Sequence, residues 1–145
     1  MSGVAVRAAD AQDAAALVPL LGQLGYPTDA AKVRARLQRL FGREDAGVLV
    51  AQLDGGLVGV AGYQLVDLLE RTAPQCRLTT LVVREGYRRR GIARVLIDAV
   101  EQRARRHGCF RLEVTTQPQR TAALALYEAV GFERRPHRLV KQLFA

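Results

Sequence analysis

Two periods in the apolar positions divide the chain into predicted helices and strands. Apolar residues recur every three or four positions, as on one buried helix face, over residues 11–24, 28–41, 92–107 and 121–130. Runs of strand-forming residues occupy 4–8, 48–53, 57–66, 77–83 and 110–115, and residues 133–144 are expected to supply one or two more strands. This order predicts an α+β or mixed-sheet fold with one central strand–helix–strand unit.

Short polar and glycine-containing segments mark where these elements begin and end. Asp10 is placed to cap the first helix, and Asp54-Gly55-Gly56 joins two apolar runs as in a β-hairpin. A glycine follows each predicted helix and favours its termination: Gly25, Gly42, Gly108 and Gly131. No internal repeat or low-complexity linker interrupts the 145 residues, so we predict a single domain over residues 1–145.

Composition narrows the classes of protein to which the chain can belong. Hydrophobic residues make up 49% and charged residues 25%, which suits a buried core and excludes a wholly disordered chain. No apolar run reaches the roughly 18–20 residues of a membrane helix, and the first twenty residues lack a signal-peptide core. We therefore expect no membrane partner and a cytoplasmic location. Cys76 and Cys109 lack metal-ligand spacing, so we expect no metal site.

The basic excess is confined to the second part of the chain. Residues 1–83 contain eight basic and eight acidic residues, whereas residues 84–145 contain fourteen and six and carry the whole net charge of +8. This asymmetry indicates an anionic partner there: a nucleic acid, an acidic surface or a phosphorylated cofactor. Because arginine outnumbers lysine by twenty to two, a general preference for solvated arginines is the alternative.

Three consecutive arginines, at residues 88–90, stand between a predicted strand and the clearest predicted helix. The first amides of a helix have no partner within it and carry the positive end of its dipole, so this junction can bind an anion. Gly91 allows a phosphate to approach the backbone closely, and Ala93 keeps the next side chain small. Neither a Walker A loop nor a dinucleotide-binding glycine motif is present, and a helix start with solvated arginines is the alternative.

A second motif lies in the last predicted helix, where Ala123 precedes Tyr127 by four residues and Gly131 and Phe132 follow. Tyr127 taken alone would be an ordinary core aromatic. The segment 88–93, which reads R-x-x-G-x-A, lies about 35 residues earlier. Together the two motifs resemble the GNAT superfamily of acetyl-CoA-dependent N-acetyltransferases, and the order of elements is similar along nearly the whole chain. The resemblance implies that family's fold, a mixed, mostly antiparallel central sheet flanked by helices.

The resemblance also implies acetyl-CoA as the co-substrate and assigns residues to it. Its pyrophosphate would lie on the amides of the helix start, and its pantetheine arm would pair with the backbone of the preceding strand. The binding residues so implied are Leu81, Val82, Val83, Arg88, Arg89, Arg90, Gly91, Ile92, Ala93 and Arg94. Arg120 stands where many members have a cofactor-contacting asparagine, and it would bind a phosphate or cap the site.

Direct acetyl transfer from a thioester to an amine follows from the same resemblance. A backbone N–H of Leu81, Val82 or Val83 would polarise the acetyl carbonyl, and Tyr127 would protonate the departing thiolate. Glu113 is the candidate base for the amine; the alternative is an exposed or arginine-paired carboxylate, with water as the relay. The first two helices and the loop around residues 67–75 would form the acceptor site.

We therefore expect an N-acetyltransferase, an acyltransferase that acts on a primary amine of a small molecule or of a peptide or protein N-terminus. The alternative is a non-catalytic acetyl-CoA-binding sensor or interaction module on the same fold, against which the presence of Tyr127 argues. Nucleic acid is a less favoured partner, because few aromatic residues accompany the arginines and no helix-turn-helix pattern occurs. The identity of the amine and the presence of a homodimer stay open.

Overall fold

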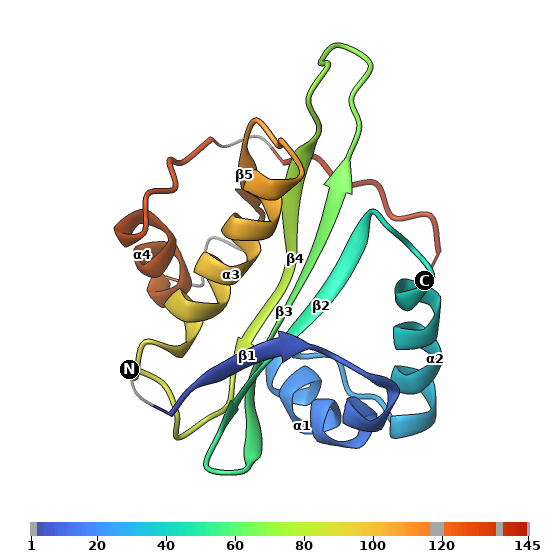
Figure 1. The fold of residues 1–145 in the computed structure, drawn as a ribbon, viewed down its shortest axis with the longest axis vertical. Helices are drawn as coiled ribbons and strands as arrows, with labels where there is room; N and C mark the ends of the chain where they lie inside the picture. Colours follow the sequence, from blue (N-terminus) through green and yellow to red (C-terminus); the bar gives the residue numbers. More distant parts are fainter. Residues whose placement is uncertain (1–2, 117–120, 136–137, 145) are drawn as a thin grey trace. The chain divides into compact units, whose positions relative to one another are not determined.

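The computed structural model describes residues 3–116, 121–135 and 138–144. The chain divides into two compact units, residues 1–115 and 116–145. The first unit contains a five-stranded sheet with helices α1, α2 and α3, and the second contains α4 (Thr121–Ala129) (Figure 1). The single domain expected from the sequence stays a prediction. Among the described residues, no helix has both the length and the apolar character needed to span a membrane.

The sheet follows the order of the sequence, β1-β2-β3-β4-β5, and is antiparallel except for the last pair. Its strands are β1 (Ala5–Ala8), β2 (Ala46–Leu53), β3 (Gly56–Val66), β4 (Gln75–Val83) and β5 (Leu112–Val114). The α+β fold predicted from the sequence is thereby confirmed. The predicted hairpin is β2–β3, and its turn residues Asp54 and Gly55 have φ of 55° and 78°. Positive φ at both positions is typical of a type I′ turn, which matches the twist of the strands.

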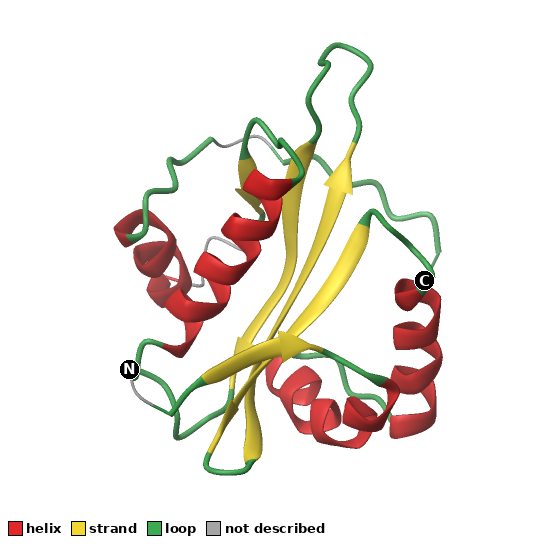
Figure 2. Ribbon diagram, viewed as in Figure 1, coloured by secondary structure: helices red, strands yellow, loops and turns green. Residues whose placement is uncertain are grey.

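Helices cover both faces of the sheet in the first unit (Figure 2). They are α1 (Ala14–Leu24), α2 (Ala30–Phe41) and α3 (Ile92–Arg106). A Cβ on Gly59 of β3 would meet the Leu96 and Ile92 side chains, so α3 lies against the face to which Gly59 points. The next residue, Val60, points to the opposite face and packs with residues of α1 and α2. That core includes Leu17, Leu20, Val33, Leu37, Val50 and Val82.

Asp10 caps a short 3₁₀ turn, Ala11–Asp13, that leads into α1. The Gln12 N–H donates to the Asp10 carboxylate at 2.7 Å, and the Asp10 N–H donates to Asp13 at 2.8 Å, which completes a capping box. Arg7 of β1 donates to both Asp13 carboxylate oxygens at 2.8 Å. The hydrogen bonds from Arg7, and secondarily the one from the Asp10 N–H, hold the pKa of the Asp13 carboxyl below its ordinary value of 3.8, although burial opposes the shift.

The last strands predicted from the sequence are absent from the described residues. Residues 133–135 and 138–144 are assigned no strand, so the prediction of one or two strands over 133–144 is wrong where the structure describes it. Apolar composition alone does not make a strand, because a strand also needs a hydrogen-bonding neighbour and a surface on which to pack. Here the large apolar side chains of this segment are exposed: Leu139, Val140, Leu143 and Phe144.

Candidate active site

Strand β4 is paired differently along its two halves. Residues 76–78 pair with β3 on one side and with β5 on the other. Thr79 is an extra residue without a partner on β3 and so forms a β-bulge, which bends and twists a strand locally. Residues 80–83 continue along β3, but the pairing with β5 has ended. Within the first unit, these residues therefore present an open strand edge.

The backbone groups at this edge alternate in direction. The Arg84 N–H donates to the Val58 C=O of β3 at 2.7 Å, so this N–H and, two residues earlier, the polar groups of Val82 point towards β3. Leu81 and Val83 direct theirs away from β3, to the open edge, while the Val82 side chain is buried in the core. Of the three strand residues predicted to pair with a pantetheine arm, Leu81 and Val83 therefore have the required orientation and Val82 does not.

The loop after β4 contains three left-handed residues before α3 begins. Gly86, Arg89 and Gly91 have φ of 90°, 64° and 76°. Left-handed residues in such a loop direct neighbouring N–H groups into a concave anion-binding surface. The first bond of α3 runs from the Val95 N–H to the Gly91 C=O at 3.1 Å, so the amides of residues 92–94 have no acceptor within the helix. The helix dipole adds positive potential at the same place.

Arginine side chains add full charges to these backbone groups. Four of the arginines predicted at this junction are exposed: Arg88, Arg89, Arg90 and Arg94. In the described part of the chain, none of them forms an ion pair with a carboxylate. Arg90 lies over the Tyr87 ring, 5.0 Å from its centre. Ile92 is buried in the core, so only its amide is available, and Ala93 is half-buried. The junction is therefore suited to a polyanion.

Helix α4, in the second unit, ends in a motif that fixes the position of Tyr127. Gly131 has φ of 104°, and its N–H donates to the Glu128 C=O at 3.2 Å. The Phe132 N–H donates to the Tyr127 C=O at 3.0 Å, which completes a Schellman motif. The two rings meet edge to face, 5.5 Å apart, and Tyr127 is buried. The Gly-Phe pair found in the sequence is therefore the helix cap that holds the Tyr127 ring.

Glu113 lies on β5, in register with Arg77 in the first half of β4. Its carboxylate accepts from the Arg77 Nη2 at 2.7 Å and from the buried Gln75 side chain at 3.3 Å. Arg111 is 3.9 Å away and also donates to the Gln75 side chain at 2.8 Å. The Glu113 carboxylate, predicted as a base, is thus paired with arginines, which is the alternative role considered for it in the sequence. Arg77, the residue in register with Glu113, precedes Leu81 by four residues.

The cysteines form no bond with each other, and both are free. Burial, and secondarily the neighbouring Cys109, raise the pKa of the Cys76 thiol to about 12. A thiol with so high a pKa stays protonated near neutral pH and is a poor nucleophile. Among the described residues, no group of three or more His, Cys, Asp or Glu side chains is placed to hold a metal ion. Arg120 lies outside the described residues.

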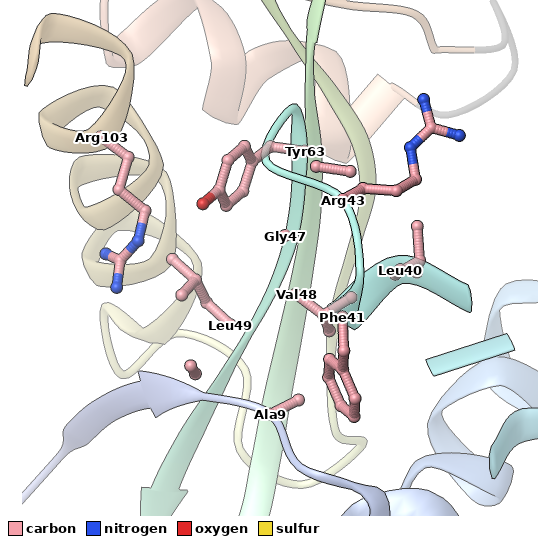
Figure 3. Close-up of a pocket in the computed structure, with 11 residues that line it drawn as sticks. Ala9, Leu40, Phe41, Arg43, Gly47, Val48, Leu49, Tyr63 and Arg103 are labelled. Carbon is pink, nitrogen blue, oxygen red and sulfur yellow. The ribbon is translucent and has the colours of Figure 1, made fainter. Parts of the chain in front are cut away.

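A shallow recess lies around the first residues of β2, towards the other edge of the sheet (Figure 3). The Tyr63 ring lies across Gly47, its register partner, and a Cβ at residue 47 would lie 2.5 Å from the Tyr63 hydroxyl oxygen. Glycine is therefore required there for the ring to pack. Phe41 and Arg103 stand at opposite sides of the recess. Its lining includes none of the predicted site residues that the structure describes.

Comparison with known proteins points in the same direction as the geometry. Residues 16–132 match the model of the acetyltransferase (GNAT) family. The aminoglycoside N(6')-acetyltransferase type 1 of Salmonella typhimurium is 26% identical over 113 residues, which cover 75% of this chain and 76% of that protein. The N-alpha-acetyltransferase RimI of Mycobacterium tuberculosis is 42% identical over 85 residues, which cover 58% of this chain and 50% of that protein.

A solved structure shows the same fold. The aminoglycoside N-acetyltransferase AAC(6')-Iy, determined in complex with CoA, superimposes with a TM-score of 0.85 and 22% identity, covering 96% of this chain and 93% of that one. The family match is stronger than the fold alone, because it spans both sequence motifs and most of the chain. It confirms the enzyme class expected from them: the chain belongs to the acetyltransferase (GNAT) family.

Proposed function

We propose that the protein transfers the acetyl group of acetyl-CoA to a primary amine of a small molecule or of a peptide or protein N-terminus. The observation that carries this proposal is the open edge of β4, which leads directly into the arginine loop and the start of α3. An arm that contains amides and ends in a diphosphate is complementary to both parts. Membership of an acetyltransferase family supports an acetyl thioester as the donor.

Acetyl-CoA would bind along this junction. The outward main-chain groups of Leu81 and the outward N–H of Val83 would pair with the pantetheine amides, and Val82 would support the strand from the core. The amides near the start of α3, at residues 89–94, would bind the pyrophosphate, and the charges of Arg88, Arg89, Arg90 and Arg94 would attract it. Arg120 stays a further candidate for a phosphate contact.

The reaction forms a C–N bond and breaks the C–S bond of the thioester. The outward N–H of Leu81 or Val83 would stabilise the negative charge that develops on the carbonyl oxygen. Tyr127 would donate its phenolic proton to the departing sulfur and regain a proton from solvent. Because Arg77 and Gln75 hold the Glu113 carboxylate, we propose that water, rather than Glu113, relays the proton from the attacking amine.

The acceptor site would be formed by α1, α2 and the loop between β3 and β4. Two relatives bear on its substrate by their names, one an aminoglycoside N(6')-acetyltransferase and the other an N-alpha-acetyltransferase. Both amine classes therefore belong in the first screen. The match over residues 16–132 spans parts of both compact units and supports one functional domain. A cytoplasmic location and a homodimer stay predictions.

The proposal is tested with purified protein, acetyl-CoA and a panel of aminoglycosides, polyamines and peptides with free N-termini. We expect acetyl-CoA to raise the Tm and at least one amine to elicit acetyl-CoA-dependent release of thiol, with the acetylated amine identified by mass spectrometry. Binding of acetyl-CoA without turnover across the panel would favour the non-catalytic module. Absence of any acetyl-CoA-induced change in Tm or heat of binding would overturn the proposal.

A further inference from the structure

Gln23, on the last turn of α1, makes two hydrogen bonds with the end of β4. Its Nε2 donates to the Val83 C=O at 3.3 Å, and its Oε1 accepts from the Glu85 N–H at 3.1 Å. The intervening residue, Arg84, directs its own N–H to β3 instead. One amide group thus joins the C=O of one residue to the N–H of the second residue after it. A neighbouring strand in a parallel pair makes this same pattern of bonds.

The two bonds lie where the open edge becomes the arginine loop. Val83 is the last residue of β4, and Glu85 precedes Gly86, the first left-handed residue of the loop. Gln23 occupies one outward group of the edge, the Val83 C=O, and leaves the outward groups of Leu81 and the Val83 N–H available. It therefore defines where the available edge ends and where the loop begins.

Gln23 is held on a rigid support. Leu17 and Leu20 bury the inner face of α1 in the core, and α1 ends at Gly25. The Gln23 residue itself is exposed, so its side chain adds little to that core. A side chain of this kind contributes chiefly through the two main-chain groups that it fixes, rather than through burial.

We propose that Gln23 is a positioning residue for acetyl-CoA, which sets the strand edge and the anion-binding loop in the register that one ligand must span. The inference rests on the proposed function, because the ligand is the one proposed there. Without the carboxamide, the Val83 C=O and the Glu85 N–H would lose the group that fixes them before the ligand binds, and fixing them on binding would weaken affinity. The acetyl transfer itself would be unaffected, because Gln23 touches no reacting group in this scheme.

The experiment compares Gln23→Met, which keeps the length of the side chain without its polar atoms, with Gln23→Glu, which keeps an acceptor for the Glu85 N–H but loses the donor to Val83. Gln102→Met, on the exposed face of α3 near the end opposite the arginine loop, is the matched control. Calorimetry with CoA and with acetyl-CoA gives the Kd of each variant. Steady-state kinetics with an acceptor from the screen give KM and kcat.

We expect both Gln23 variants to weaken CoA binding by about tenfold and to raise the KM for acetyl-CoA, with kcat within about twofold of wild type. Gln102→Met should match wild type. A Gln23→Met protein that binds CoA as tightly as wild type, or more tightly because the freed edge is easier to enter, would overturn the inference. A wild-type protein that does not bind CoA would instead overturn the proposed function.

Discussion

The two halves of β4 use their polar groups in opposite ways. Residues 76–78 are paired on both edges, and Arg77 and Gln75 engage Glu113 of the neighbouring strand. Residues 81–83 carry apolar side chains, and the polar groups that they offer belong to the main chain. The first half therefore joins strands together, whereas the second half is able to receive a partner.

One extra residue separates these two halves. The bulge at Thr79 coincides with the end of β5 pairing, and a bulge of this kind turns a strand away from its neighbour. Charged side chains can satisfy one another, as they do in the first half. The main-chain groups of an open edge can pair with a partner that carries strand-like amides, which is the chemistry that we propose for the ligand of the second half.

The largest expected effect on turnover comes from substitution of Tyr127, which lies on α4 and not on β4. Tyr127→Phe removes the proposed acid but keeps the ring, whose edge-to-face contact with Phe132 should persist. We expect kcat to fall about 10²- to 10⁴-fold while the Kd for acetyl-CoA stays unchanged. That result would assign binding of acetyl-CoA to the second half of β4 and the loop after it, and would assign to Tyr127 a role in the transfer of the acetyl group.

Tyr63→Phe is the control for this substitution, because Tyr63 lines the recess around the start of β2, whose lining includes none of the predicted site residues that the structure describes. Turnover should stay at the wild-type level in that variant. Equal turnover of Tyr127→Phe and wild type from about pH 6 to about pH 9 would contradict the acid role. A loss of acetyl-CoA binding as well would assign Tyr127 a structural role.

The next largest effect is expected on acetyl-CoA binding, at the start of α3, where the loop after the second half of β4 is proposed to bind the pyrophosphate. Gly91→Glu places a carboxylate at the start of α3, where a phosphate would approach. At about 100 times the Kd a ligand stabilises a protein by about 2.7 kcal/mol, and we expect this ligand-induced stabilisation to be lost. Gly108→Glu is the control, because Gly108 has a similar φ of 71° beyond the other end of α3. An equal Tm shift in both variants would place the pyrophosphate elsewhere.

An ion pair at the opposite edge of the sheet shows what a purely structural contact should do. Asp13→Asn removes the charge that Arg7 holds with two hydrogen bonds. We expect a loss of about 1–3 kcal/mol in the free energy of unfolding at pH 7, with no change in acetyl-CoA affinity. A changed affinity with unchanged stability would contradict this assignment.

The pH dependence of this contact follows from the lowered pKa of Asp13. A carboxyl with a lowered pKa in the folded state contributes stability above its unfolded pKa, near 3.8, and this contribution is lost as the pH falls through the lower folded value. Urea unfolding of wild type and Asp13→Asn should therefore give free energies that converge below about pH 4. Parallel curves down to pH 2–3 would contradict the cause given for the shift.

Local patterns in the sequence were sufficient to predict most of the fold. The hairpin at Asp54 and Gly55 and the helix after Gly91 depend on nearby residues, and both form as predicted. The strands expected over 133–144 depended on a distant partner, which apolar composition does not specify. The bulge at Thr79 was likewise not predicted, because it is defined by a register between two strands rather than by its own sequence.

The candidate site divides in the same way. The arginine loop and Tyr127 could be named from motifs, because helix amides and a helix cap are local features. Gln23 could not be named, because an isolated glutamine on a helix has no signal until the fold brings it to Val83, sixty residues away. The inward orientation of Val82 also required the register of β3 and β4.

Glu113 is the residue for which the sequence left two roles open. Its substitution is expected to have the smallest effect, and it tests whether the first half of β4 only joins strands. Glu113→Gln keeps an acceptor for Arg77 and removes the negative charge that β5 places beside the first half of β4. Because we propose a water relay, we expect kcat to stay within about threefold of wild type. The loss in unfolding free energy should be below about 1 kcal/mol, since Arg77 and Glu113 are both partly exposed.

Arg77→Gln separates the two roles, because it removes the partner and leaves the carboxylate in place. If Glu113 only joins β4 to β5, the two substitutions should lower the Tm by similar small amounts and leave the pH dependence of kcat/KM unchanged. If Glu113 accepts the proton from the amine, Glu113→Gln alone should lower kcat by about 10²-fold or more. Arg77→Gln would then retain turnover, because the carboxylate that accepts the proton stays in place.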